Sequence, residues 1–262
     1  MPNELCKLDQ TRPFCPGIPA AGGTKGKRGN MIEVYAVDLT GSLEKGIYEQ
    51  LLAYVSKEKR ARIRRFYKEE DRIRGLMADI LIRTIIIRKL GLKNEKIKFF
   101  TNDYGKPFLK DREDFQFNLS HSGIWVVCAV DNRHIGIDVE RIQPIDLDIS
   151  KNYFSPDEHQ DLMSKADKFS YFFTLWSLKE SYIKIKGKGL SMPLNSFSIK
   201  FFSRDEIRIK AKGRLLEEIF FVQYDIHKDY KMAVCAHHRN FPRDITIKTM
   251  EQLADEFLNH CI

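Results

Sequence analysis

The order in which helical and extended patterns alternate constrains the fold more than any other feature of these 262 residues. Apolar residues recur at helical spacing over residues 56–91 and again over residues 169–186. Four short runs rich in β-branched and aromatic residues follow each helix, at 97–100, 115–119, 125–130 and 135–139, then at 197–202, 207–210, 219–225 and 232–236. This repetition predicts an α+β fold, a pseudo-two-fold duplicate of two similar α/β halves with the active site at the seam. In each half, a long helix packs on a small, mainly antiparallel sheet.

Composition and pattern divide the chain into a leader and two halves. Residues 1–30 are rich in Gly, Pro, Lys and Arg without periodicity, which predicts a disordered leader that need not be native. A strand pattern begins directly after Met31. We therefore expect an N-terminal half at 31–138 and a C-terminal half at 139–262, and we expect a chain that starts at Met31 to keep its stability and activity.

The overall composition limits the class of protein. Hydrophobic residues make up 43% and charged residues 31% of the chain, as in ordinary globular proteins. No apolar run approaches the roughly 20 residues that a membrane span needs, and residues 1–30 lack the apolar segment of a signal peptide. The five cysteines follow neither a zinc-binding nor a CxxC spacing. These features predict a cytoplasmic protein without a membrane segment, and we expect a monomer.

The formal net charge of +8 indicates an anionic partner. Part of the excess falls in the leader, where five basic residues face two acidic ones. The moderate remainder suits a phosphorylated small molecule or an acidic protein. A nucleic-acid-binding protein is the alternative that the charge alone suggests, but no RNP, zinc-finger or helix-turn-helix pattern is present. We therefore expect no nucleic acid among the partners.

Two carboxylates in the phrase Gly-Ile-Asp-Val-Glu, residues 136–140, are candidates for a metal site. Because side chains alternate along a strand, Asp138 and Glu140 point to one face, and Ile137 and Val139 point to the other. Such carboxylates repel each other unless a cation lies between them, and oxygen ligands favour Mg²⁺, Mn²⁺ or Ca²⁺ over zinc. An ordinary half-exposed strand explains this pair alone at least as well.

A second phrase, Trp-Ser-Leu-Lys-Glu-Ser-Tyr-Ile-Lys, fits the second long helix. Glu180 and Lys184 are four residues apart and share a helix face, with Trp176 one turn before Glu180. Taken alone, this pair is better explained as a surface ion pair, which is common at this spacing, than as part of a functional site.

A third phrase, Phe-Asn-Leu-Ser-His-Ser-Gly, puts the hydroxyl of Ser120 beside the imidazole of His121 at a strand end. Adjacent residues cannot face each other as nucleophile and base, and no GxSxG elbow is present, so a hydrolase is disfavoured. Hydroxyl, imidazole and backbone N–H donors suit a phosphate instead. Lys106, in Tyr-Gly-Lys-Pro, is a further candidate for an anion contact.

These three phrases, in this order and at this spacing, resemble the surfactin-type 4'-phosphopantetheinyl transferases. The similarity covers residues 31 to about 253 and includes four further segments, at 59–67, 104–107, 187–198 and 231–236. Each motif alone is only modestly specific for this family, whereas three motifs in the same order and at the same spacing over such a span are highly specific for it. The leader has no counterpart in the family.

The resemblance implies a metal and substrate site. Asp138, Glu140 and Glu180 would hold Mg²⁺, or alternatively Mn²⁺, which also binds the pyrophosphate of coenzyme A. Ser120 and His121 would bind the 3'-phosphate region of coenzyme A. The complete set of residues implied for coenzyme A combines phosphate donors with residues that shape the adenine end: Lys59, Arg74, Lys106, Pro107, Ser120, His121 and Lys184.

The resemblance also implies the reaction, in which a carrier-protein serine attacks the β-phosphate of coenzyme A and 3',5'-ADP leaves. Glu180 and Lys184 would be the catalytic residues, and either Glu180 or a metal-bound water would take the serine proton. Apo peptidyl carrier domains of nonribosomal peptide and antibiotic synthesis, and acyl carrier proteins, would dock near Gly187 to Pro193. A module that binds the nucleotide without chemistry is the competing function, and the three carboxylates argue against it.

Overall fold

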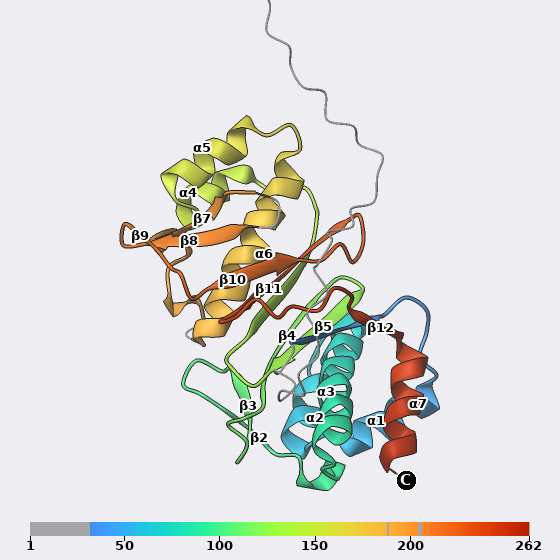
Figure 1. Cartoon of the computed structure of the whole chain (residues 1–262). Helices are drawn as coiled ribbons and strands as arrows, with labels where there is room; N and C mark the ends of the chain where they lie inside the picture. The colour runs from blue at the N-terminus through green and yellow to red at the C-terminus, as the bar shows by residue number, and fades with distance from the viewer. Residues whose placement is uncertain (1–31, 188, 204–205, 262) are drawn as a thin grey trace, which may run out of the picture.

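The structure is a computed structural model, and it describes residues 32–187, 189–203 and 206–261. The leader expected at residues 1–30 lies outside this range. Figure 1 shows two bodies joined through long strands, and the first described strand and the last helix both belong to the lower body. None of the described helices is long and apolar enough to cross a membrane.

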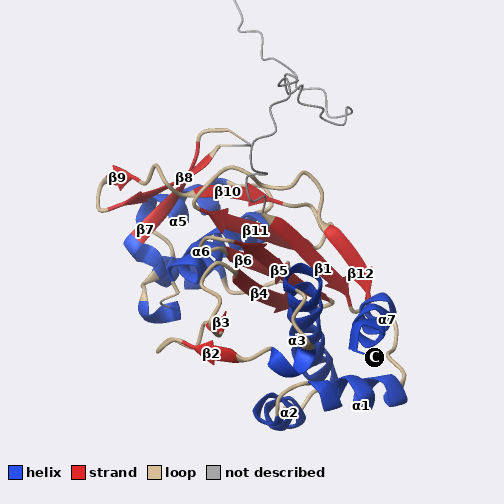
Figure 2. Cartoon of the chain, turned by 60° about the horizontal axis from the view of Figure 1, so that its bottom comes forward, coloured by secondary structure: helices blue, strands red, loops and turns tan. Residues whose placement is uncertain are grey.

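The lower body is a four-stranded sheet with helices beside it (Figures 1 and 2). Its strand order is β12-β1-β5-β4, in which β1 and β12 are parallel and the other pairs are antiparallel. Alternate residues of β5, Val126 and Cys128, are fully buried in one core with Leu76 and Ile80 of the longest helix. The strands are β1 (Glu33–Asp38), β4 (Gln116–Ser122), β5 (Trp125–Asp131) and β12 (Thr246–Thr249), and the helices are α1 (Lys45–Tyr54), α2 (Lys57–Arg64), α3 (Glu69–Leu90) and α7 (Met250–Cys261).

The upper body packs one long helix, α6, against the antiparallel sheet β10-β11-β6. A second small sheet, β7-β8-β9, and two short helices lie beyond it. The elements are β6 (Gly136–Arg141), α4 (Ser150–Tyr153), α5 (Pro156–Ser164), α6 (Lys168–Lys186), β7 (Phe197–Phe201), β8 (Ile207–Ala211), β9 (Arg214–Leu215), β10 (Phe220–Gln223) and β11 (Tyr230–Ala236). A hairpin, β2 (Phe99–Thr101) and β3 (Pro107–Leu109), and the 3-10 turns η1 (Asn94–Lys96), η2 (Leu147–Ile149), η3 (Gly189–Ser191) and η4 (Leu194–Ser196) complete the described elements.

The predicted α+β class, with helices on small and mainly antiparallel sheets, is confirmed. The first helical region, however, is two helices rather than one. Ser56 caps α2 by accepting a hydrogen bond from the Lys59 amide, and Gly91 ends α3 with a left-handed φ of 63°. The break lies between them because Glu69, Glu70 and Asp71 give α3 an acidic first turn, which favours a new helix N-terminus.

The last two elements return to the start of the chain. Strand β12 pairs in parallel with β1, and Met250, Leu253 and Phe257 of α7 are fully buried in the core of the lower body. Sequence analysis assigned these residues to the C-terminal half, because local pattern does not reveal which sheet a strand joins. The division of the chain into halves at residue 138 stays a prediction.

The two bodies meet where β4 lies beside β6 (Figure 2). Side chains bridge the two strands: Asn118 Oδ1 accepts a hydrogen bond from the Ile137 amide at 2.9 Å, and Ser122 Oγ accepts one from the Arg141 amide at 3.1 Å. Below them, a core shared by β1, β5, β6 and β11 is fully buried. This junction presents the face of β6 that carries the predicted carboxylates.

Candidate active site

Strand β6 presents Asp138 and Glu140 on one face, as its alternation predicts. Ile137 and Val139 are fully buried in the core below. Asp138 is buried and Glu140, near the strand end, is half-buried. A buried carboxylate needs partners that offset its loss of water, and these come from β4 and α6.

Lys184 of α6 is the cationic partner of Asp138. Its ammonium donates hydrogen bonds to Asp138 Oδ1 at 2.6 Å, to Ser120 Oγ at 2.8 Å and to the Ile137 carbonyl at 3.1 Å. Helix α6 comes this close to β6 because residue 136 is a glycine. A Cβ at Gly136 would lie 1.9 Å from a backbone carbonyl oxygen of α6, so any other residue would force the helix and the strand apart.

Two serines of β4 face the two carboxylates of β6. Ser120 donates to Asp138 Oδ1 at 2.8 Å, and Ser122 donates to Glu140 Oε2 at 3.1 Å. Sequence analysis singled out Ser120 and missed Ser122. The signal was present, since residues two apart on a strand share a face and the Ser-x-Ser pattern matches the Asp-x-Glu pattern across the junction.

The three predicted carboxylates have raised pKa values. Burial is the main cause: it raises the pKa of Asp138, of Glu180 and of Glu140, the last to about 7. Repulsion by Asp138 raises the pKa of Glu140 and Glu180 further, and the Lys184 ammonium opposes the shift at all three. The three side chains are therefore within electrostatic reach of one another.

This donor set fits a divalent cation that prefers oxygen ligands. Asp138 Oδ2 is buried and has no hydrogen-bond partner among the described residues, which is costly unless a cation approaches it. Carboxylates alone favour Mg²⁺ or Mn²⁺ over zinc. In the described part of the chain, no three His, Cys, Asp or Glu side chains are close enough to form a metal centre as they stand. Asp138, Glu140 and Glu180 therefore stay a predicted metal set.

Two predicted phosphate-binding residues come together at the exposed end of β4. Desolvation and the positive charges of Arg74 and Lys184 lower the pKa of His121. The guanidinium of Arg74 donates to the Gly123 carbonyl at 2.8 Å and pairs with Asp71 at 2.6 Å. These contacts hold Arg74 of α3 beside the turn that follows His121.

A cavity of about 770 Å³ lies between α2, α3 and the β2–β3 hairpin. Two residues predicted to bind coenzyme A, Lys59 and Pro107, line it, together with Arg62 and Lys98, which sequence analysis missed. Arg62 is three residues after Lys59 on one helix, and that spacing was its signal. Burial lowers the pKa of Lys59, and the nearby Asp79 carboxylate opposes this shift.

Lys106 is placed differently from the anion contact that the sequence predicts. Its side chain is buried, and its ammonium donates to the carbonyl of Lys184 at 2.6 Å and to the carbonyl of Ile135 at 3.3 Å. Burial lowers the pKa of Lys106 to about 8. Its neighbours Gly105 and Pro107 line the cavity, whereas the ammonium is held at the end of α6.

The predicted docking segment, Gly187 to Pro193, directly follows α6. Lys188 within it lies outside the described residues, and a 3-10 turn at Gly189–Ser191 follows. A groove of about 600 Å³ lies beyond Glu140 and is lined by Trp176 and by apolar side chains that include Ile145, Ile149, Phe172 and Phe173. The groove gives Trp176 a place beside the carboxylates, as the helix spacing predicts.

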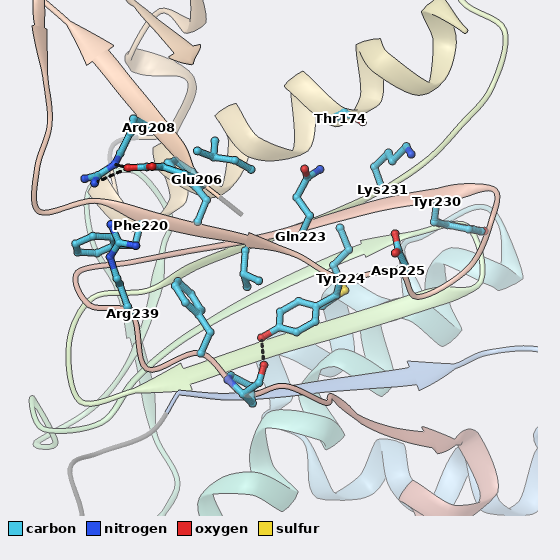
Figure 3. Close-up of a pocket in the computed structure, with 16 residues that line it drawn as sticks. Thr174, Glu206, Arg208, Phe220, Gln223, Tyr224, Asp225, Tyr230, Lys231 and Arg239 are labelled. Atoms are coloured by element: carbon cyan, nitrogen blue, oxygen red, sulfur yellow. Dashed lines mark hydrogen bonds and ion pairs between the residues drawn. The ribbon is translucent and has the colours of Figure 1, made fainter. Parts of the chain in front are cut away.

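A separate pocket of about 440 Å³ lies at the free edge of β10. Figure 3 shows Gln223 and Lys231 pointing toward α6, with Arg208 and Glu206 paired at one end. None of the predicted site residues lines this pocket. The predicted residues Ser120, Asp138 and Lys184 lie instead at the junction of β4, β6 and α6.

Comparison with known proteins identifies the family. The family model "4'-phosphopantetheinyl transferase superfamily" matches residues 134–235, and "4'-phosphopantetheinyl transferase, N-terminal" matches residues 44–133. The chain belongs to the 4'-phosphopantetheinyl transferase family, enzymes that transfer phosphopantetheine to carrier proteins.

Two curated relatives match over nearly their whole length. The 4'-phosphopantetheinyl transferase Sfp of Bacillus subtilis (strain 168) is 42% identical over 224 residues, which are 85% of this chain and 100% of the relative. The 4'-phosphopantetheinyl transferase gsp of Aneurinibacillus migulanus is 37% identical over 232 residues, 87% of this chain and 96% of the relative. A solved structure, the Thermotoga maritima holo-[acyl-carrier-protein] synthase, overlaps at a TM-score of 0.30 with 14% identity, 40% of this chain and 64% of its own.

Proposed function

We propose that the chain transfers 4'-phosphopantetheine from coenzyme A to a serine of apo carrier proteins at the junction of β4, β6 and α6. In this proposal the junction is the seam between two halves related by a pseudo-two-fold axis. The observation that supports it is the ion pair between Lys184 and the buried Asp138, whose charge also raises the pKa values of Glu140 and Glu180. Such a cluster of perturbed groups is typical of a catalytic site.

The carboxylates and Lys184 divide the chemistry between them. Asp138, Glu140 and Glu180 would hold Mg²⁺, or Mn²⁺, which when bound neutralises charge on the pyrophosphate of coenzyme A. Lys184 would contact the same phosphates, since its side chain is 24% exposed. Glu180 would accept the serine proton, because burial raises the pKa of its carboxylate and so makes it a stronger base. The bond to 3',5'-ADP breaks as the serine oxygen bonds to phosphorus.

Coenzyme A would lie between the cavity and the exposed end of β4. Lys59 and Arg62 offer positive charge to its phosphates from one side of the cavity, and Pro107 shapes the adenine end. Ser120, His121 and Arg74 would bind the 3'-phosphate region of coenzyme A. Lys106 would contribute through its backbone, because its ammonium is held by the carbonyls of Lys184 and Ile135.

The carrier protein would dock near Gly187 to Pro193. Peptidyl carrier domains and acyl carrier proteins are both expected substrates, because acidic surfaces around the carrier serine would suit the basic end of α6. The apolar groove beyond Glu140, lined by Trp176 and Ile149, adds contact area beside this segment. A cytoplasmic location, a monomeric state and the absence of nucleic-acid partners stay predictions.

The test is intact-mass analysis of an apo carrier protein incubated with the chain, coenzyme A and Mg²⁺. We expect the carrier to gain the mass of one phosphopantetheine group. A carrier with its serine replaced by alanine, a reaction with EDTA and the variant Glu180→Gln are the controls, and each should gain no mass. Binding of coenzyme A without transfer to either carrier type would contradict the proposal and favour a binding module.

A further inference from the structure

The β2–β3 hairpin contacts the last turn of α6, although 78 to 85 residues separate them in sequence. Asn102 Nδ2 donates to the Gly187 carbonyl at 2.7 Å, and Lys106 Nζ donates to the Lys184 carbonyl at 2.6 Å. Both acceptors belong to the end of α6, where the last four carbonyls of a helix lack partners within the helix. The hairpin therefore caps the helix that carries Glu180 and Lys184.

The amide of Asn102 is oriented by its own turn. Its Oδ1 accepts hydrogen bonds from the Tyr104 amide at 3.0 Å and from the Lys106 amide at 2.9 Å. This leaves Nδ2 directed at Gly187. The contact is close, because a Cβ at Gly187 would lie 3.3 Å from Asn102 Nδ2 and 3.4 Å from Lys106 Cδ.

Lys106 joins three elements at one point. Its buried ammonium reaches the Lys184 carbonyl of α6 and, at 3.3 Å, the Ile135 carbonyl directly before β6. This is the place where Gly136 lets the backbones of α6 and β6 approach. A cation at a helix C-terminus also interacts favourably with the helix dipole, more so when partly buried.

Lys184 is consequently held at both ends. Its carbonyl is bound by Lys106, and its ammonium is bound by Asp138 and Ser120. A shift of α6 along β6 would break both sets of hydrogen bonds together. The hairpin thus bears on the geometry of the carboxylates although none of its residues touches them in a hydrogen bond or ion pair among the described residues.

We propose that Asn102 and Lys106 are positioning residues that fix α6 against β6 and so set where Glu180 and Lys184 stand relative to Asp138. This inference rests on the proposed function, in which those three residues perform the transfer. Small displacements of a catalytic group have large effects on rate, because the groups must meet the reacting atoms in a narrow range of geometry. Substitutions that loosen the contact between the hairpin and α6 should therefore slow the chemical step.

The competing role for Lys106 is direct contact with a phosphate of coenzyme A, and steady-state kinetics separates the two. A positioning role predicts that Lys106→Met and Asn102→Ala each lower kcat by about tenfold or more while KM for coenzyme A changes less than about twofold. Lys106→Arg keeps the charge and should recover part of kcat. Lys110→Met, an exposed lysine beside the same hairpin, is the matched control and should keep the wild-type kcat.

The two variants should also be coupled. Because both act through the end of α6, the loss in kcat of the double variant should be smaller than the product of the two single losses. Unfolding in urea, followed by circular dichroism, establishes that each variant is folded. If Lys106→Met does not fold, Asn102→Ala still decides, because it removes a neutral and only half-buried side chain.

Wild-type kcat in folded Asn102→Ala, or a raised KM with unchanged kcat in Lys106→Met, would overturn the positioning role. Lys184→Ala, measured in the same series, distinguishes a failure of the proposed active site from a failure of the positioning role alone. Full activity of Lys184→Ala would overturn the proposed active site itself. Loss of activity in Lys184→Ala, together with unchanged kcat in both hairpin variants, would leave the active site standing and remove only the inference about the hairpin.

Discussion

Two lysines of α6, five residues apart, each form an ion pair with a carboxylate from another element, and the two pairs differ in completeness. Lys179 is fully buried and lies 2.9 Å from Glu158, and it also donates to the carbonyls of Leu194 at 3.0 Å and Phe197 at 2.7 Å. Glu158 in turn accepts hydrogen bonds from two backbone amides, at 2.7 and 2.8 Å. Every charged atom of this pair has a partner.

The pair of Lys184 and Asp138 is left incomplete. Lys184 is partly exposed, and Asp138 Oδ2 is buried without a hydrogen-bond partner in the described part of the chain. Burial raises the pKa of Asp138 despite the neighbouring ammonium. The same residue types on one helix therefore serve two purposes: a pair with all its hydrogen bonds made stabilises the fold, and a pair with one oxygen free is available to a ligand.

Breaking the complete pair should give the largest effect on stability. Lys179→Met leaves the Glu158 carboxylate buried without its cation, and we expect the free energy of unfolding in urea to fall by about 3–5 kcal/mol. Replacing Lys151, which pairs with Asp148 on the surface, by Met should cost less than about 1 kcal/mol. Equal losses for the two variants would contradict the distinction drawn between the pairs.

The incomplete pair should affect turnover and not stability. Asp138→Asn keeps the shape of the side chain and removes the charge that would bind the cation, so kcat/KM should fall about a hundredfold or more, which corresponds to about 2.7 kcal/mol. The free energy of unfolding should stay within about 1 kcal/mol of wild type. The variant loses the ion pair with Lys184, but it also loses the cost of burying a charged oxygen that has no hydrogen-bond partner. Near-normal turnover at low Mg²⁺ would remove Asp138 from the site.

The raised pKa of Glu140 predicts a pH effect on the stability of the protein in EDTA. Its pKa is about 7 in the folded protein against 4.5 in the unfolded chain, so the folded state binds this proton more tightly. The stabilisation is complete at acidic pH and is lost as pH rises through 7. Relative to Glu140→Gln, wild type should lose about 2.5 kcal/mol between pH 5 and pH 8. If the free energy of unfolding of the two proteins depended on pH in the same way, the pKa of Glu140 would not be raised in the folded protein.

Substitution of His121, at the exposed edge of the site, should give the smallest effect on activity. If His121 binds the 3'-phosphate of coenzyme A, dephospho-coenzyme A should be a poorer donor for wild type. His121→Ala should then narrow the difference in kcat/KM between the two donors by several-fold, about 1 kcal/mol, which is the typical net contribution of one hydrogen bond. Equal discrimination by both proteins would assign His121 another role.

Local pattern in the sequence sufficed for the parts of the site that depend on one element. Alternation placed Asp138 and Glu140 on one face of a strand, and helix spacing placed Trp176 on the side of Glu180. Such features are encoded within a few residues, and the structure agrees with them.

Features that depend on contact between distant elements could not be predicted in this way. The sequence around Lys106, Tyr-Gly-Lys-Pro, predicts an anion contact. Its ammonium instead faces a helix carbonyl, because α6 ends beside it. The pair of Glu158 and Lys179 joins two helices and is invisible to periodicity. Alternation along β4 puts Ser122 on the same face as Ser120, but its partner Glu140 is set by the packing of β4 beside β6.

The return of β12 and α7 to the first strand has a consequence for the order of events during synthesis. Phe257 and Leu253 complete a core whose other members, such as Leu76 and Val126, emerge from the ribosome more than a hundred residues earlier. At 5–20 residues per second, that interval lasts roughly six to thirty-six seconds, during which the part of this core that α7 covers stays exposed. The nascent chain must therefore remain unaggregated with its first strand lacking the parallel neighbour, and a chaperone that shields this edge would have its greatest effect in that interval.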